Sequence, residues 1–147
     1  MNWPYAHLVL NHVPVLGTLF VFLLLLTGAW RKSEELLRLS LWWFVALTVV
    51  SIPIKFTGDF AFEALGKEPW VDQAVAKRHE ESADQATAGV FVLGIAAATG
   101  LFLGKRKGAI PRWAVVTTAI LALATFALMA RTAYSGGQLR HTEVHAR

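Results

Sequence analysis

The chain contains no cysteine. This absence excludes disulfides, thiolate zinc sites, iron–sulfur clusters, covalently attached c-type haem and thiol nucleophiles. Charged residues are scarce as well, at 16% of the 147 residues, whereas a soluble domain carries roughly 25%. A bound metal or cofactor must therefore be held by histidine, carboxylate, methionine or backbone groups.

Hydrophobic residues are abundant by contrast. They make up 55% of the chain, aromatic residues make up 12%, and six residues are tryptophans; mean hydropathy is +0.47. A single domain of this size cannot bury so much apolar surface in its own core. The composition therefore predicts a membrane protein in contact with the lipid bilayer, and it argues against a disordered chain and against a nucleic-acid partner.

Four apolar runs are each long enough to cross a bilayer, because about 20 apolar residues span the hydrocarbon core. The first run has neither a basic region before it nor a small-residue cleavage site after it, so we expect a helix rather than a signal peptide. The sequence predicts an all-α, integral membrane, antiparallel four-helix bundle that forms one domain over residues 1–147. The expected spans are about residues 6–30, 39–56, 83–104 and 112–134, with an outer loop at 57–82 and an outer C-terminal tail at 135–147.

The outer loop is expected to have two parts. A short helical turn is predicted around Phe60–Leu65, and the third helix is predicted to begin from Val71 onward and to project above the bilayer. Near the N-terminus, Pro14 is expected either to kink the first helix or to lie in its first turn.

The short loops at 31–38 and 105–112 are dense in lysine and arginine. Dense basic residues in short loops mark the cytoplasmic side of a membrane. Seven of the 14 basic residues fall on each side, so the orientation rests on density rather than on the total. We expect a multi-pass protein of the bacterial inner membrane with both termini in the periplasm.

All five histidines fall on the outer side in this topology. By chance five residues would share one side about once in sixteen, and outer loops are where polar residues belong, so a solvated surface is one explanation. The other is a site, because ionisable groups at membrane depth are expensive and tend to be functional. The histidines are His7, His12, His79, His141 and His145.

The spacing of these histidines allows several roles. His12 lies near the outer edge of the first span beside Pro14, and it is either a ligand or a residue hydrogen-bonded to a neighbouring helix. His141 and His145 are four residues apart, which would place both on one face of a helix and suit a metal ion. The candidate metal ligands are His12, His79, His141 and His145.

Two short segments carry a family resemblance. The opening from His7 to Pro14 (HLVLNHVP) resembles the HPxxxHFP opening of a bacterial family of predicted four-helix membrane proteins of unknown function, with Leu8 and Val13 where that family has proline and phenylalanine. The segment from Tyr134 to His141 (YSGGQLRH) is similar to that family's Gly-Gly…His ending, and His79 fits its histidine at the third helix. The family is similar in outline to small membrane b-type cytochromes, and this resemblance implies a haem.

The leading hypothesis is a membrane b-type haem protein that transfers electrons near the periplasmic face, within a respiratory-type complex. Haem held without cysteine needs axial histidines from facing helices. His12 with His79 or His141 would supply them, and His7 is a further candidate. The expected redox partner is a quinone or a periplasmic cytochrome, so the chain would be a carrier rather than an enzyme by itself. Cationic candidates for the haem propionates are Lys55, Arg131 and Arg140.

Two other hypotheses stay open. The chain would also suit a non-catalytic accessory subunit that packs against other membrane subunits, or against further copies of itself, because it has small-residue seams and little soluble mass. A third hypothesis is a metal- or proton-handling protein that uses histidines and carboxylates at the outer mouth. The spans 13–30 and 113–130 contain no charged residue, which argues against a polar pathway through the membrane.

Overall fold

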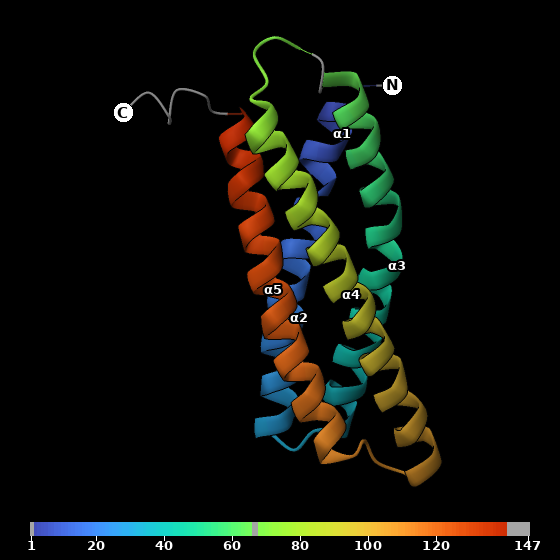
Figure 1. Ribbon diagram of the computed structural model, residues 1–147. Coiled ribbons are helices and arrows are strands. Elements are labelled where there is room, and N and C mark those ends of the chain that lie inside the picture. Colours follow the sequence, from blue (N-terminus) through green and yellow to red (C-terminus); the bar gives the residue numbers. More distant parts are fainter. Residues whose placement is uncertain (1, 66–67, 141–147) are drawn as a thin grey trace.

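A computed structural model describes residues 2–65 and 68–140 of the chain (Figure 1). The described residues are mostly helical and contain no strand, which confirms the predicted all-α class. Four long helical segments follow one another, and the first is divided in two by Asn11. The helices are α1 (Trp3–Leu10), α2 (His12–Trp30), α3 (Glu34–Leu65), α4 (Gln73–Lys107) and α5 (Arg112–Arg140).

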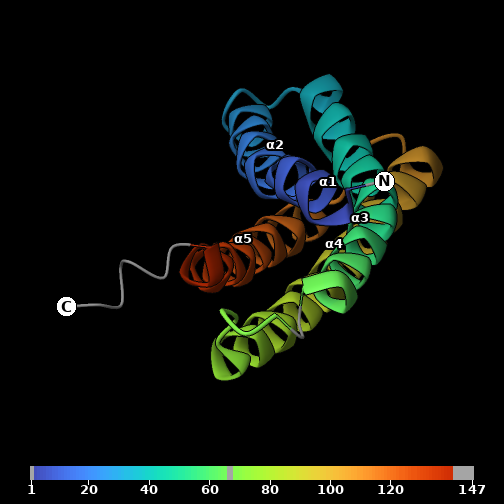
Figure 2. The ribbon, with the colours of Figure 1, turned by 90° about the horizontal axis from the view of Figure 1, so that it is seen from above.

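The long helices α2, α3, α4 and α5 form a closed ring. Each contacts the next along the chain, and α5 also contacts α2, while α1 packs mainly on α3 (Figure 2). The four long helices run in alternating directions along the chain, so the bundle has two distinct ends (Figure 1). We call the end with the turns at 31–33 and 108–111 the basic end, and the end with α1, the C-terminus of α3 and the N-terminus of α4 the histidine end.

The division between α1 and α2 lies where the sequence places a proline and an asparagine. The side chain of Asn2 accepts a hydrogen bond from the Tyr5 amide at 3.2 Å and begins α1. Pro14 is the third residue of α2, so its missing N–H falls in the first turn, where no intrahelical partner exists. The expectation that Pro14 lies in a first turn is therefore confirmed.

The helices extend further toward the histidine end than the apolar runs do. Helix α3 continues without a break to Leu65, so the segment around Phe60 is the end of a long helix and not a separate turn. Helix α4 begins at Gln73, where the Asp72 side chain accepts hydrogen bonds from two amides of the first turn at 2.8 and 3.2 Å. Polar residues end an apolar run without ending a helix, because exposed helix continues readily into water.

Helices α3 and α4 approach closely through small residues of α4. A Cβ on buried Gly100 would lie 3.0 Å from Leu41, and one on Gly94 would collide with Thr48. The Thr48 hydroxyl lies 2.9 Å from the carbonyl of Phe44 in its own helix and 3.1 Å from that of Val90 in α4. Glycine at these positions therefore permits an interhelical contact that a side chain would block.

At the basic end, Arg38 ties three elements together. Its Nη2 lies 2.9 Å from the Glu34 carboxylate and donates to the carbonyls of Gly104 and Gly108, each at 3.3 Å. Glu34 also accepts the backbone N–H of Ile110 at 2.9 Å. Gly108 itself ends α4 in the left-handed region, at a φ of 81°, which favours glycine.

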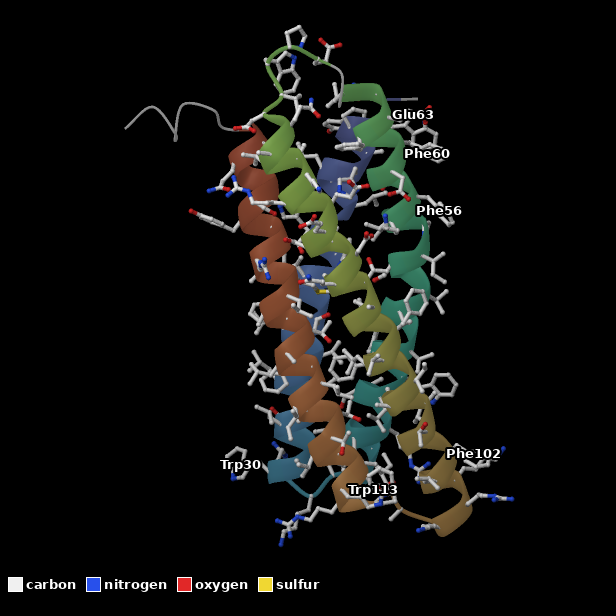
Figure 3. All side chains as sticks on the ribbon, in the orientation of Figure 1. Trp30, Phe56, Phe60, Glu63, Phe102 and Trp113 are labelled. Atoms are coloured by element: carbon white, nitrogen blue, oxygen red, sulfur yellow. The ribbon has the colours of Figure 1, made fainter. Side chains whose placement is uncertain are left out.

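Each of the four long segments is long and apolar enough to cross a membrane. They contain 28, 32, 35 and 28 residues, and a 28-residue helix is about 42 Å long against a hydrocarbon core of about 30 Å. Aromatic side chains project outward from the bundle at both ends, with Trp30, Phe102 and Trp113 at the basic end and Phe56 and Phe60 at the other (Figure 3).

Candidate functional site

Four helices converge at the histidine end. Helix α1 lies against the last turns of α3, where the rings of Trp3 and Phe60 pack with centroids 4.8 Å apart. The first turns of α4 lie against the last turns of α5 (Figure 1). Each of these two helix pairs buries part of one imidazole, that of His7 between α1 and α3 and that of His79 between α4 and α5.

His7 contacts the Thr57–Gly58 segment of α3. Its Nδ1 lies 3.1 Å from the hydroxyl of Thr57, and that hydroxyl donates its own hydrogen to the Ile54 carbonyl at 2.7 Å. Because the hydroxyl hydrogen is already used, the hydroxyl oxygen must accept from His7, so the proton of the neutral ring is on Nδ1. The ring lies over Gly58, where an added Cβ would be 2.9 Å from Cε1 of His7.

His79 makes a matching contact with the end of α5. Its Nδ1 lies 3.1 Å from the Thr132 carbonyl and 3.2 Å from the Ser135 hydroxyl, which in turn donates to the same carbonyl at 2.9 Å. A carbonyl oxygen can only accept, so Nδ1 of the neutral His79 ring carries the proton. A Cβ added to Gly136 would lie 2.9 Å from Cε1 of His79.

The imidazole of His7 lies within electrostatic range of His79, Asp59 and Lys55. Both rings are half-buried, and each is held at Nδ1 by another helix. The second ring nitrogen, Nε2, is therefore the unprotonated one on both rings, and its lone pair is the group that can accept a proton or bind a metal.

An ion group lies beside this pair. The Lys55 ammonium is 2.5 Å from the carboxylate of Asp59 in α3 and 3.2 Å from that of Asp84 in α4. It therefore joins α3 to α4, and its charge is already balanced by two carboxylates. The carboxylates of Asp59 and Asp84 are largely exposed, so this group contributes little to stability.

The other predicted site residues lie elsewhere. His12 is exposed, and its Nδ1 lies 2.9 Å from the Leu8 carbonyl in the preceding turn. Arg131 is exposed on α5, and Arg140 is the last residue of that helix. His141 and His145 lie outside the described residues. Within residues 2–65 and 68–140, no group of three or more His, Asp or Glu side chains is placed to hold a metal ion.

Sequence reasoning selected His7 and His79 but missed the residues that hold them. These residues are small and uncharged, and the local sequence alone does not identify them as partners of a histidine. They are Thr57, Gly58, Ser135 and Gly136. The available signal was a hydroxyl residue next to a glycine at both positions, near the outer end of a helix. That signal becomes informative only when the facing helix is known.

Comparison of the chain with known protein families, with curated proteins and with solved structures finds no match. The function must therefore be argued from the side chains of this chain and from their positions in the bundle. The histidine end is a candidate region, since it holds two half-buried imidazoles and an ion group.

Proposed function

We propose that this chain is a membrane-embedded b-type haem protein that transfers electrons near the periplasmic face, and that His7 and His79 are the residues that would hold the haem. The observation that carries the proposal is that both rings are half-buried and are held at Nδ1 by a facing helix, whereas His12 is exposed and bonds to the preceding turn. Metal-bound histidines in proteins usually donate one ring N–H to a carbonyl, carboxylate or water and bind the metal through the other nitrogen. Both imidazoles have this arrangement, and they come from different helices.

The packing of the two rings supports this assignment. Gly58 and Gly136 leave room for each imidazole at a place where any Cβ would meet ring atom Cε1. Each ring is therefore held both by a hydrogen bond and by its contact with a backbone. Ligands fixed in this way keep their orientation when a cofactor binds.

The depth of the two histidines also agrees with a site near one membrane surface. His7 is 23 residues before Trp30 and His79 is 26 residues before Lys105, distances of about 34 and 39 Å along a helix. With the basic end at one surface of a hydrocarbon core about 30 Å thick, both imidazoles lie at the opposite interface. The basic loops assign the basic end to the cytoplasm of a bacterial inner membrane, so the histidine end is periplasmic.

A haem bound here would supply one-electron redox chemistry, with a quinone or a periplasmic cytochrome as its partner. The chain's own residues hold and orient the ligands. Arg131 and Arg140 would pair with the propionates, whereas Lys55 would first have to leave Asp59 and Asp84. His12 and His141 are less suited on this view, since the first is exposed and bonds to the Leu8 carbonyl in the preceding turn, and the second lies outside the described residues.

The test is a visible spectrum of the full-length protein, purified after expression with a haem supply. We expect a Soret band that shifts when dithionite is added. The variants His7→Ala and His79→Ala should each lose or shift this band, and His12→Ala should keep it. That contrast separates the His7–His79 pair from the pairing with His12 that the sequence alone favours.

A colourless wild-type protein, or a spectrum indifferent to both His7→Ala and His79→Ala, would contradict the proposal. Size-exclusion chromatography of each variant shows whether the fold is retained, so loss of haem is distinguished from loss of protein. A colourless protein that purifies with larger membrane partners would instead favour the accessory-subunit hypothesis.

A further inference from the structure

A groove lined by cationic and apolar side chains lies at the basic end, far from the histidines. Helices α3 and α4 leave a groove of about 340 Å³ between them on the outside of the bundle. Its lining combines cations with apolar and aromatic side chains, namely Arg38, Trp42, Val45, Ala98, Leu101, Phe102 and Lys105. A volume of this size falls within the range of roughly 300–1,000 Å³ found for small-molecule sites.

The groove has an ordered polarity along the helix axes. On α3, Arg38 comes first at the basic end, and Trp42 and Val45 follow toward the middle of the bundle. On α4, which runs the other way, Lys105 is at the basic end and Ala98 lies deepest. Seven residues separate the cation from the deepest apolar residue on each helix, or about 10 Å. The groove therefore changes from cationic to apolar over the length of a lipid glycerol region and the start of an acyl chain.

The cations of the groove remain available to a ligand. All the hydrogen bonds of Arg38 use Nη2, so within the described part of the chain its Nε–H and Nη1 groups have no protein partner. Lys105 is exposed, and the neighbouring Arg106 guanidinium stacks over the Phe102 ring at 5.0 Å. Glu34 balances one positive charge, which leaves those of Lys105 and Arg106 uncompensated at this rim.

A second groove adjoins the first at Trp42. It measures about 330 Å³ and is lined only by apolar side chains of α3, namely Leu39, Trp42, Trp43 and Ala46. Trp42 lines both grooves and is 61% exposed, so its side chain separates them. One cationic rim with shallow apolar surface on both sides of Trp42 suits a single phosphate that carries two acyl chains.

We propose that the basic end binds an anionic phospholipid from the adjacent leaflet, with its phosphate at Arg38 and Lys105 and its acyl chains on either side of Trp42. Basic pockets between transmembrane helices on the cytoplasmic side bind anionic lipid head groups in this manner. The proposal concerns the end of the bundle opposite the histidines, and its test does not depend on haem.

The test is native mass spectrometry of the full-length protein in detergent, after exposure to equimolar phosphatidylglycerol and phosphatidylcholine. We expect one phosphatidylglycerol molecule to be retained in preference. Lys105→Gln should reduce its retention about fivefold, since a basic residue near an anionic surface contributes on the order of a few-fold in affinity. Trp42→Ala should also reduce retention of phosphatidylglycerol, because it removes the side chain that lines both grooves.

Matched controls are available in the same region. Lys107→Gln removes a cation two residues from Lys105, and Trp30→Ala removes a tryptophan that is 84% exposed; neither residue lines a groove. Both controls should retain the lipid as the wild type does. Equal retention of the two lipids by the wild type, or equal losses in Lys105→Gln and Lys107→Gln, would overturn the proposal.

Discussion

The two half-buried histidines are held by the same local chemistry on two unrelated helix pairs. In each case a hydroxyl group gives its hydrogen to a carbonyl of its own helix and offers its oxygen to an imidazole from another helix. A glycine next to that hydroxyl residue brings the backbone close to the ring. The tautomer of a histidine, which decides which nitrogen can bind a metal, is thereby set by residues that carry no charge.

Replacement of Thr57 tests this hydrogen bond directly. The variant Thr57→Val keeps the shape of the side chain but removes the hydroxyl acceptor of half-buried His7, which keeps only its interaction with the Ile54 carbonyl. The loss of one such hydrogen bond costs about 0.5–1.5 kcal/mol, so the free energy of unfolding should fall by that amount. Thr57→Ser keeps the hydroxyl and should recover most of the loss. Chemical unfolding in detergent measures both, and an equal loss in the two variants would contradict the role assigned to the hydroxyl.

The adjacent glycines at the end of α5 offer a sharper comparison. A Cβ at Gly136 would lie 2.9 Å from the His79 ring, whereas a Cβ at Gly137 would meet nothing within 4 Å. Gly136→Ala should therefore destabilise the protein by about 1–3 kcal/mol through overpacking. Gly137→Ala should be neutral or stabilising by up to about 1 kcal/mol, because alanine favours the helix. Similar effects of the two substitutions on the melting temperature would show that His79 does not pack as described.

At the scale of the helices, hydropathy predicted the number and class of the elements but not their ends. Lys55, Gly58 and Asp59 interrupt the apolar pattern of α3, yet the helix continues to Leu65. Hydropathy indicates where the apolar surface ends. The backbone hydrogen bonds of the helix continue past that point, so the helix ends later. The start of α4 was predicted more closely, because the helix expected from Val71 onward begins at Gln73, well before the predicted span at residue 83.

Which histidines face the bundle interior was a harder question for the sequence. His7 and His12 lie on opposite sides of the division at Asn11. Asn11 keeps helical dihedral angles, and five helical residues correspond to a rotation of about 140°, so His7 contacts α3 while His12 stays exposed. The sequence could place both residues at one end of the molecule, and only the packing of α1 on α3 distinguishes them.

The close contact of α3 and α4 predicts a compensating pair of substitutions. Gly94→Ala forces a methyl group against Thr48 and should destabilise the bundle by about 1–3 kcal/mol. Thr48→Ala removes the hydroxyl and methyl groups that such a side chain would meet, together with the bond to the Val90 carbonyl, and leaves only the Thr48 Cβ at 2.9 Å. The double variant should be more stable than the sum of the two single effects predicts, because the residues are in contact. Strictly additive changes in the free energy of unfolding would argue against the contact.

The whole molecule is polarised along the bundle axis. The basic end carries seven lysine and arginine residues in the two segments 31–38 and 105–112, against Glu34 and Glu35. The opposite end carries the histidine pair and the ion group of Lys55. Between them, no more than 39% of the residues in any apolar window are buried within the bundle, so most of the middle surface suits lipid. A molecule of this kind presents a different chemistry to each side of a membrane.

This polarity can be tested with single cysteines, because the chain has none of its own. We expect Glu68→Cys, in the exposed turn at the histidine end, to react with a membrane-impermeant maleimide in intact bacterial spheroplasts. Lys107→Cys, at the basic end, should react only after lysis, since dense basic residues are retained in the cytoplasm. Reaction of both variants from outside would mean that the helices do not cross the membrane. The reverse pattern would keep the bundle and the histidine pair but place the proposed haem and its redox partner on the cytoplasmic side.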